Sequence, residues 1–497
     1  MAKSFYITTT LPYVNADPHV GFAMEIIRAD AIARVKQLEG YDVFFNTGTD
    51  EHGLKLWTAA EKENKDVQTY VDEYAERFRG LKELLGIHPD VHFIRTTDAH
   101  HVQAAQEFWK RCNARGYIYK KTYQTKYCVG CELEKTDSEL VNNECPIHPG
   151  KPVELLDEEN YFFKFSSFEK PLLEFYNTHP NFVIPDFRFN EIKSFVASGL
   201  EDFSISRLAS KMPWGVPVPD DNEHVMYVWF DALVNYISTL GWPKSDAVAS
   251  DRPTTSKKLF RPEENLFDKY WLHGTPTQYC GKDNLRQQSA MWQAMLMAAD
   301  LPPSHTIIIN GFITGDGGIK MSKSIGNVLN PYDIVTEYST DALRYFSLRE
   351  LSPFEDSPFT MERFKDAYNS GLANGIGNLS SRILTLSEKY LDACPPIPEQ
   401  SDFTQYFKMY ETFDLKKVTD FIWSEIADMD KTIQETEPFK VVKVDMEKGK
   451  ALITDLVLRL YQVARMLNPI LPETTTKLKK LICDNKKPKQ PLFLRKE

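Results

Sequence analysis

The first fifty residues contain a strand, a helix and a second strand in an order that limits the chain to one kind of sheet. Residues 5–10 and 41–47 are β-branched and aromatic runs, which are typical of strands. Over residues 23–38, apolar side chains recur at the spacing of an amphipathic helix, which ends at Gly40. A β-α-β unit requires a parallel sheet with a right-handed crossover, and ligands of such sheets bind beyond the carboxyl ends of the strands.

Further strand-like runs follow much later in the chain, at residues 224–230, 277–280 and 306–313. If these runs complete the sheet, residues 98–225 form an insertion between its two halves. From residue 364 onward the apolar period is helical. We therefore expect an α/β chain with a Rossmann-like parallel-sheet domain, split by the insertion and followed by a C-terminal α-helical bundle. The expected domains are residues 1–97 and 226–312 for the two halves of the sheet domain, 98–225 for the insertion, 313–363 for a connecting region and 364–497 for the bundle.

The chain of 497 residues has a net charge of −11, but this charge is unevenly distributed. Residues 440–497 hold 14 Lys and Arg against 6 Asp and Glu, an excess of +8, whereas residues 1–439 carry −19. A basic end on an acidic body is typical of a protein that meets phosphates with that end, and a solvated helical face is the alternative interpretation.

The composition is that of a globular protein, and we expect the protein to stay in the cytoplasm. Hydrophobic residues make up 42% and charged residues 26% of the chain, which excludes collagen-like and wholly disordered chains. Asp455, Arg459 and Arg465 interrupt the apolar stretch of residues 451–467, so no membrane span is expected. The N-terminus lacks the apolar segment of a secretory signal, and 7 Cys imply no disulfide framework.

Three cysteines and a histidine have the spacing of a metal site, Cys128-x2-Cys131-x13-Cys145-x2-His148. Two thiolates on one tight turn, and a thiolate and an imidazole on a second, supply four ligands for tetrahedral Zn²⁺. Because four protein ligands leave no open position, we expect one structural zinc ion. The alternatives are unrelated buried thiols and redox chemistry of the first cysteine pair.

Two segments at expected strand ends carry residues that suit a charged ligand. Pro18 favours a helix start, so His19 and Gly21 would lie at a helix N-terminus, where amides can bind a phosphate. Asp50 follows the second strand and would lie at the same sheet edge, where it could hold an ammonium group. Taken singly, His19 could be an ordinary helix cap and Asp50 a loop cap.

A third segment, Lys320-Met321-Ser322-Lys323-Ser324, follows the glycine-rich turn of residues 315–318. Two lysines on such a loop could close over a polyphosphate and neutralise the charge on departing pyrophosphate. A solvated surface loop is the alternative interpretation of a lone Lys-Ser cluster.

Together these segments resemble the signatures of class I aminoacyl-tRNA synthetases. Residues 18–22, Pro-His-Val-Gly-Phe, are similar to the HIGH signature, and residues 320–324 match the KMSKS signature letter for letter. The 301 positions from His19 to Lys320 leave too little room for the large editing domain of the enzymes specific for Ile, Val and Leu. With its single zinc knuckle and with residues 46–53 and 227–232, the chain resembles the methionyl-tRNA synthetases over essentially its whole length.

This resemblance implies a pocket for methionine. It implies that the Leu11 backbone and the Asp50 carboxylate bind the amino group of methionine. It also implies that aromatic and apolar side chains surround the thioether, and such side chains suit a polarizable sulfur. The implied methionine-binding residues are Leu11, Tyr13, Asp50, Trp229, Ala232, Leu233, Tyr236 and Asn310. Without the resemblance, Trp229 and Tyr236 would be interpreted as core packing, and Asn310 stands where family members often have a His.

The resemblance also implies an ATP site that works with Mg²⁺. The implied catalytic residues are His19, Lys320 and Lys323. The implied ATP-binding residues are His19, Gly21, Arg207, Lys282, Asp283 and Lys323. Phe22 replaces the second His of HIGH, which removes one phosphate donor at a loss of about 1.5–3 kcal/mol if nothing compensates.

The implied reaction joins methionine to tRNA(Met), including the initiator, through methionyl-adenylate. Residues 313–363 would form the KMSKS and stem-contact region, and residues 364–497 would bind the anticodon. Asn378 and Arg382 lie four apart on one helical face and match the anticodon pair of the family. Phe439 stands where the family commonly has Trp and could stack on an anticodon base. We expect a monomer, and the alternative functions are a non-catalytic tRNA-binding paralog and an adenylating ligase with a small acceptor.

Overall fold

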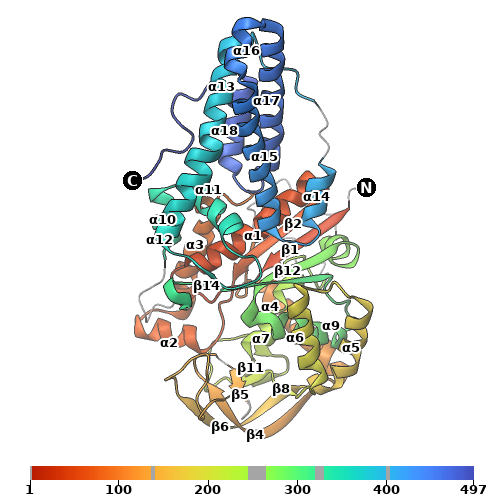
Figure 1. The fold of residues 1–497 in the computed structure, drawn as a ribbon. Coiled ribbons are helices and arrows are strands. Elements are labelled where there is room, and N and C mark those ends of the chain that lie inside the picture. Colours follow the sequence, from red (N-terminus) through yellow and green to blue (C-terminus); the bar gives the residue numbers. More distant parts are fainter. Residues whose placement is uncertain (1–2, 132, 136–139, 245–264, 320–328, 399–402) are drawn as a thin grey trace.

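A six-stranded parallel sheet lies at the centre of the N-terminal part of the chain (Figure 1). The computed structural model describes residues 3–131, 133–135, 140–244, 265–319, 329–398 and 403–497. The strand order is β3-β2-β1-β12-β13-β7, and every neighbouring pair is parallel. These strands are β1 (Ser4–Thr9), β2 (Asp42–Thr49), β3 (His92–Arg95), β7 (Val183–Ile184), β12 (Thr275–Gly281) and β13 (Thr306–Asn310).

The predicted β-α-β unit is confirmed by β1, helix α1 (Val20–Leu38) and β2. Alternate side chains of β1 point to opposite faces of the sheet. Phe5 and Ile7 belong to the core that contains the apolar face of α1, whereas Tyr6 belongs to the core on the other face. The sheet is therefore covered on both faces, which is the rule for parallel sheets.

The prediction that residues 224–230 join the parallel sheet is wrong. Strand β11 (Asp221–Met226) pairs antiparallel with β10 (Pro217–Val218) and β9 (Ser206–Leu208), and the chain then enters helix α7 (Val228–Ala232). A short apolar run does not distinguish a main-sheet strand from a strand that leads into a buried helix.

The segment between β3 and β9 contains an antiparallel sheet with the order β5-β4-β6-β8. Its strands are β4 (Ile118–Cys128), β5 (Leu133–Lys135), β6 (Val153–Phe163) and β8 (Phe203–Ser204). Strands β4 and β6 pair over their whole length, so Cys128 lies at the far end of a long hairpin, opposite Val153. The helices of this segment are α4 (Ala99–Ala114), α5 (Glu169–Thr178) and α6 (Asp186–Ala197), and between α5 and α6 the chain returns to the main sheet as β7.

The C-terminal part is helical, as predicted, and it extends away from the sheet in Figure 1. Its helices are α13 (Asn378–Tyr390), α14 (Thr404–Tyr410), α15 (Leu415–Thr436), α16 (Pro438–Val444), α17 (Met446–Met466) and α18 (Pro472–Cys483). Preceding them are β14 (Ile313–Thr314), α10 (Pro331–Glu337), α11 (Thr340–Tyr345), β15 (Ser357–Pro358), α12 (Met361–Ala367) and a π-helical segment, η8 (Tyr368–Gly377). The remaining helices of the sheet domain include α2 (Leu54–Lys62), α3 (Val67–Leu84), α8 (Asn235–Ser238) and α9 (Trp292–Ala298).

A buried guanidinium joins the helical part to the sheet domain. Arg344 donates to Asp30 of α1 at 2.7 Å, and both side chains are buried. The same guanidinium donates to the carbonyls of Leu85, Pro469 and Ile470, so α1, α11 and the α17–α18 turn meet at one residue. Because removing one partner of such a pair leaves an uncompensated buried charge, this contact holds the two parts in one arrangement.

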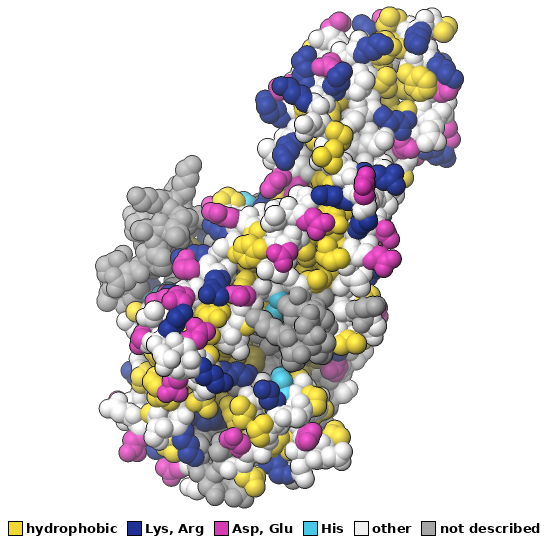
Figure 2. Space-filling model, turned by 90° about the vertical axis from the view of Figure 1, so that its left-hand side faces the viewer, with side chains coloured by type: hydrophobic (Ala, Val, Ile, Leu, Met, Phe, Trp, Pro, Cys, Tyr) yellow, Lys and Arg dark blue, Asp and Glu magenta, His cyan; other side chains and the backbone are white. Residues whose placement is uncertain are grey.

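Lys and Arg side chains are spread over the helical part on the face shown in Figure 2. Among the described residues, no helix combines the length and the apolar content that a membrane span requires.

Candidate functional site

The residues expected to form a ligand site gather at the carboxyl edge of the parallel sheet. Strand β1 has β2 on one side and β12 on the other. The connection after β1 therefore runs toward β2, and the connection after β12 runs in the opposite direction toward β13, which is the arrangement at which such sheets bind ligands. Leu11 follows β1, Asp50 follows β2, and Gly281 and Asn310 end β12 and β13 in register with each other. The edge at which such sheets bind ligands thus carries the predicted residues.

His19 is the N-cap of helix α1. Its Nδ1 accepts a hydrogen bond from the Gly21 backbone N–H at 3.0 Å, so the neutral ring carries its proton on Nε2. A Cβ at position 21 would lie 2.7 Å from His19 Cε1, which explains the glycine. The ring of Phe22 packs on the His19 imidazole with centroids 4.4 Å apart. The side chain that replaces the second His of the signature therefore fixes the orientation of the first.

Asp50 and Tyr13 connect the loops that follow β2 and β1. The two residues form an isolated parallel bridge, and Asp50 N–H donates to the Pro12 carbonyl at 2.9 Å. Asp50 and Leu11 are both buried. The structure thus brings together Leu11, Tyr13 and Asp50, which the resemblance places around the amino group of methionine.

Helices α7 and α8 and the turn between them carry the residues expected to line the thioether pocket. Trp229 is half-buried, whereas Ala232, Leu233 and Tyr236 are buried. The Tyr236 hydroxyl accepts from Gln288 Nε2 at 2.6 Å, and Tyr6 donates its hydroxyl proton to the Tyr236 carbonyl at 2.9 Å. The Tyr236 ring is therefore held firmly by the core, and Trp229 is the most exposed of the four side chains.

A buried carboxylate with two imidazoles lies behind these segments, and the sequence analysis missed it. Asp231 is fully buried, with His52 Nδ1 at 2.6 Å and His101 Nε2 at 2.8 Å from its two oxygens. His101 Nδ1 lies 2.8 Å from Ser238 Oγ. Burial alone would raise the pKa of Asp231, but the imidazoles outweigh burial and lower that pKa to about 2.

This Asp231 cluster joins two parts of the expected methionine pocket. His52 comes two residues after Asp50, and Asp231 comes two residues after Trp229. An ionised carboxylate that bonds to both segments fixes their relative position. An Asp inside the apolar run of residues 228–234 was a sequence signal of a buried carboxylate, but it did not indicate the two histidines that meet it.

Glu25 is a second residue that the sequence analysis missed. It lies one helical turn after Gly21, and its Oε1 accepts from the Thr10 backbone N–H at 2.8 Å. Burial raises the pKa of Glu25 to about 8, against the opposing effect of backbone hydrogen bonds from Thr10 and Gly281. A carboxyl group that keeps its proton near neutral pH can donate to a ligand at this edge.

Three of the six residues expected to meet ATP line one cavity of about 760 Å³ between the sheet edge and the insertion, whereas His19 and Gly21 do not line it. Arg207 is buried, stacks on the Tyr227 ring at 4.4 Å and donates to Ser204 Oγ at 2.8 Å. Lys282 is ion-paired with Asp356 at 2.7 Å. Burial alone would raise the pKa of Asp356, but this pairing and the hydrogen bond from the Phe312 backbone N–H outweigh burial and lower that pKa. Arg207, Lys282 and Asp283 all line the cavity, as do Cys145 and Ile147 of the insertion. The predicted Lys320 and Lys323 lie outside the described residues.

The four predicted metal ligands converge. Their ligand atoms all lie within 4.8 Å of one another, with Cys131 Sγ 3.3 Å from Cys145 Sγ and 3.2 Å from His148 Nδ1. At Gly130, a Cβ would lie 2.5 Å from His148 Cγ, so the turn between the first two cysteines accepts only glycine. Three thiols and an imidazole at these distances suit a metal ion.

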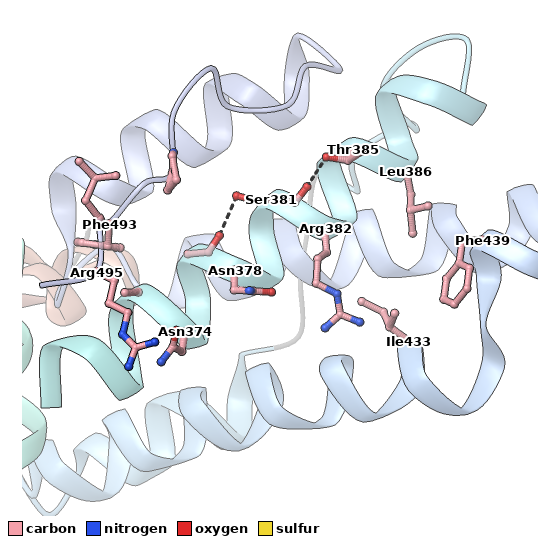
Figure 3. Close-up of a pocket in the computed structure, with 14 residues that line it drawn as sticks. Asn374, Asn378, Ser381, Arg382, Thr385, Leu386, Ile433, Phe439, Phe493 and Arg495 are labelled. Atoms are coloured by element: carbon pink, nitrogen blue, oxygen red, sulfur yellow. Dashed lines mark hydrogen bonds between the residues drawn. The ribbon is translucent and has the colours of Figure 1, made fainter. Parts of the chain in front are cut away.

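The residues expected to read an anticodon line a second cavity, of about 590 Å³, in the helical part (Figure 3). Asn378 and Arg382 come from α13 and Phe439 from the start of α16. Arg382 is 39% exposed and forms an ion pair with Asp430, and Phe439 is 38% exposed. The structure thus brings the three predicted residues together from two helices that are far apart in the sequence.

Comparison with known proteins relates the whole chain to one group of enzymes. The sequence family described as tRNA synthetases class I (M) matches residues 5–149 and 130–384. A methionine–tRNA ligase of Thermotoga maritima is 39% identical over 97% of this chain and 76% of its own length. The corresponding ligase of Streptomyces coelicolor is 38% identical, with coverage of 96% and 89%.

Solved structures agree with this relation. The structure of Mycobacterium tuberculosis methionyl-tRNA synthetase in complex with methionyl-adenylate has a TM-score of 0.87 at 35% identity, and the match covers 96% of this chain and 94% of that one. The free form of that synthetase matches with a TM-score of 0.82 and covers 100% of this chain. With its sheet-edge site, its Cys and His cluster and its helical bundle, the chain belongs to the class I tRNA synthetases, in the family of the methionine–tRNA ligases.

Proposed function

We propose that the chain activates methionine with ATP and transfers it to tRNA(Met). The observation that carries the proposal is the meeting of His19, Asp50 and the ends of β12 and β13 at one sheet edge, in a chain of this family. The Asp50 carboxylate would hold the methionine ammonium group, and Trp229 would contact the thioether. The buried Oδ1 of Asn310, which has no hydrogen-bond partner among the described residues, would accept a hydrogen bond from the ligand.

In the first step the methionine carboxylate attacks the α-phosphorus of ATP, and the bond from that phosphorus to the bridging oxygen of pyrophosphate breaks. His19 Nε2–H would donate to a phosphate oxygen, and the N-terminal amides of α1 face the same charge. Lys320 and Lys323 would neutralise the departing pyrophosphate. Mg²⁺ bound with ATP would share the phosphate charge.

In the second step the 2′-hydroxyl of the terminal adenosine of tRNA attacks the activated carbonyl and releases AMP. Neither step needs a side-chain nucleophile, because positioning and electrostatic stabilisation supply the rate. Arg207, Lys282 and Asp283 would hold the nucleotide in the cavity that they line.

Thermal stabilisation by amino acids tests the substrate. Because a ligand that binds only the folded chain adds about 2.7 kcal/mol at a concentration of one hundred times its Kd, methionine should raise the denaturation temperature measurably. Each of the twenty amino acids is added in turn and the midpoint of thermal denaturation is recorded. Stabilisation by another amino acid, with none by methionine, would overturn the proposed substrate.

We further propose that Cys128, Cys131, Cys145 and His148 hold one structural Zn²⁺. The distances among these ligand atoms fit a tetrahedral ion, which would fix the end of the β4–β6 hairpin beside the ATP cavity. Lys55 Nζ donates to the Gly130 carbonyl at 2.8 Å, which links the knuckle to helix α2 near the expected methionine site.

Removing one ligand should release the metal. We expect about one equivalent of zinc in the purified chain and almost none in Cys145→Ser, measured by elemental analysis. Cys394→Ser, at a cysteine outside the cluster, is the matched control and should keep the metal. A metal-free chain with full aminoacylation activity would contradict the proposal.

For the tRNA, we propose that Asn378 and Arg382 hydrogen-bond anticodon bases and that Phe439 stacks on one of them, a contact worth about 1–3 kcal/mol. This cavity lies in the helical part, on elements that contribute no residue to the sheet-edge site. Arg382→Ala should therefore slow aminoacylation of tRNA with the CAU anticodon about tenfold to a hundredfold and leave methionine-dependent pyrophosphate exchange nearly unchanged. Equal losses in the two assays would show that Arg382 supports the fold instead.

A further inference from the structure

One wall of the cavity in the helical part is formed by the C-terminal segment of residues 491–495. On the other elements, Asn374 of η8 and Asn378 and Arg382 of α13 form a row that lines the same cavity, and Asn378 and Arg382 lie four apart on one face of α13. In the view of Figure 3, the Arg495 guanidinium lies beside Asn374, at the end of this row away from Phe439.

The two cations of this cavity differ in their partners. Arg382 is ion-paired with Asp430, whose second oxygen accepts from Gln434 Nε2 at 2.8 Å. Arg495 is exposed, and in the part of the chain that the structure describes no carboxylate lies within ion-pair distance of its guanidinium. Arg382 therefore offers hydrogen-bond donors without net charge, whereas Arg495 offers a positive charge that no acidic side chain neutralises.

The backbone around Arg495 is held in place on both sides. Phe493 is buried, and the Tyr368 hydroxyl donates to the Leu494 carbonyl at 2.9 Å. Asn369 Nδ2 donates to the Lys496 carbonyl at 2.8 Å, and Lys496 N–H donates back to Asn369 Oδ1 at 2.9 Å. A terminal segment fixed by reciprocal hydrogen bonds presents its side chain in a defined place, which lowers the entropy cost of a contact.

We propose that Arg495 binds a backbone phosphate of the RNA strand whose bases meet Asn378 and Arg382. The inference rests on the proposed anticodon function and adds a phosphate contact to it. The phosphate contact would contribute to the affinity for tRNA, whereas the contacts to the bases determine which anticodon sequence binds. An exposed, unpaired guanidinium at the rim of a base-binding cavity suits a phosphate. Each nucleotide of a single strand carries a backbone phosphate, so a bound base brings a phosphate close to the rim of the cavity. The basic excess of residues 440–497, of which Arg495 is a part, has the sign that this contact needs.

The test measures the KM for tRNA, and its dependence on salt, in Arg495→Gln, Arg495→Lys and Lys489→Gln. Lys489 is an exposed cation of the same C-terminal segment that does not line the cavity, so its variant removes an equal charge from a neighbouring place. Loss of one phosphate contact should raise the KM about fivefold near 0.1 M salt and reduce the slope of log affinity against log salt by about 0.7. Pyrophosphate exchange without tRNA should not change in any of the three variants.

The outcomes separate this inference from the proposed function. We expect Arg495→Lys to stay near the wild-type KM, because a phosphate accepts a point charge, and Lys489→Gln to change it much less than Arg495→Gln. Equal effects of Lys489→Gln and Arg495→Gln, or an unchanged salt slope in Arg495→Gln, would overturn the assignment. An Arg495→Lys variant as weak as Arg495→Gln would overturn the phosphate as the partner. If Arg382→Ala impairs charging and Arg495→Gln does not, only this inference fails, whereas no effect of either variant would contradict the anticodon function itself.

Discussion

His19→Ala should slow methionine-dependent pyrophosphate exchange by about 10²–10³, because a donor aimed at charge that develops in the transition state is worth about 2.7–4 kcal/mol. The structure supports this role through the tautomer: Nδ1 accepts from the Gly21 N–H, so the proton is on Nε2. Packing of Phe22 on the imidazole holds the ring in one orientation. The KM for methionine should change much less than kcat, since the ground state lacks the developing charge.

His19→Asn is the matched control, because it separates capping from phosphate binding. Asparagine is a strong N-cap residue and can accept from the same backbone N–H, so the helix start should keep its stability. It lacks the ring nitrogen that reaches the phosphate, and exchange should remain slow. An Asn variant with wild-type exchange would show that His19 is only a cap.

Asp231→Ala should destabilise the sheet domain by about 3–5 kcal/mol and raise the KM for methionine. The reason is that His52 and His101 would lose the oxygens that lie 2.6 and 2.8 Å from their ring nitrogens, in a site without solvent. Because the cluster links the segment of Asp50 to that of Trp229, the methionine pocket should loosen more than the ATP site. Thermal denaturation and the separate KM values for methionine and ATP measure the two effects.

The pH dependence of stability gives a second measure of Asp231. Its pKa in the folded chain is about 2, below the ordinary value of an aspartate, so its contribution is fully present above about pH 4 and is lost as the pH falls toward 2. Asp231→Ala should lack this part of the acid transition. Ser238→Ala, which removes only the outermost hydrogen bond of the cluster, should cost about 1 kcal/mol and keep it. If Asp231→Ala and Ser238→Ala had the same stability and the same acid transition, the carboxylate would not be the group that holds the cluster together.

The sequence predicted the elements whose patterns are long and local. The first β-α-β unit, the C-terminal helices and the convergence of Cys128, Cys131, Cys145 and His148 follow from periodicity and spacing, and all are present in the structure. Strands β3 and β7 are too short for an alternation to be read, and β7 reaches the sheet from inside the insertion. The run at residues 224–230 misled because its second half is a buried helix.

The Asp231 cluster could not be predicted, because its three members lie at positions 52, 101 and 231 and meet only through the fold. The same holds for Arg495, which reaches the α13 cavity from the end of the chain. The effect of Phe22 was foreseen only as a lost donor, and its packing on His19 depends on a ring orientation that no motif specifies. Motifs thus indicate which side chains meet the substrate, and the fold decides which side chains hold them.

The most direct test of the account is ATP–pyrophosphate exchange without tRNA, measured with each of the twenty amino acids. We expect exchange with methionine, strongly reduced in His19→Ala and nearly unchanged in Arg382→Ala and Arg495→Gln. Exchange that is absent with methionine, or that is supported equally well by another amino acid, would contradict it.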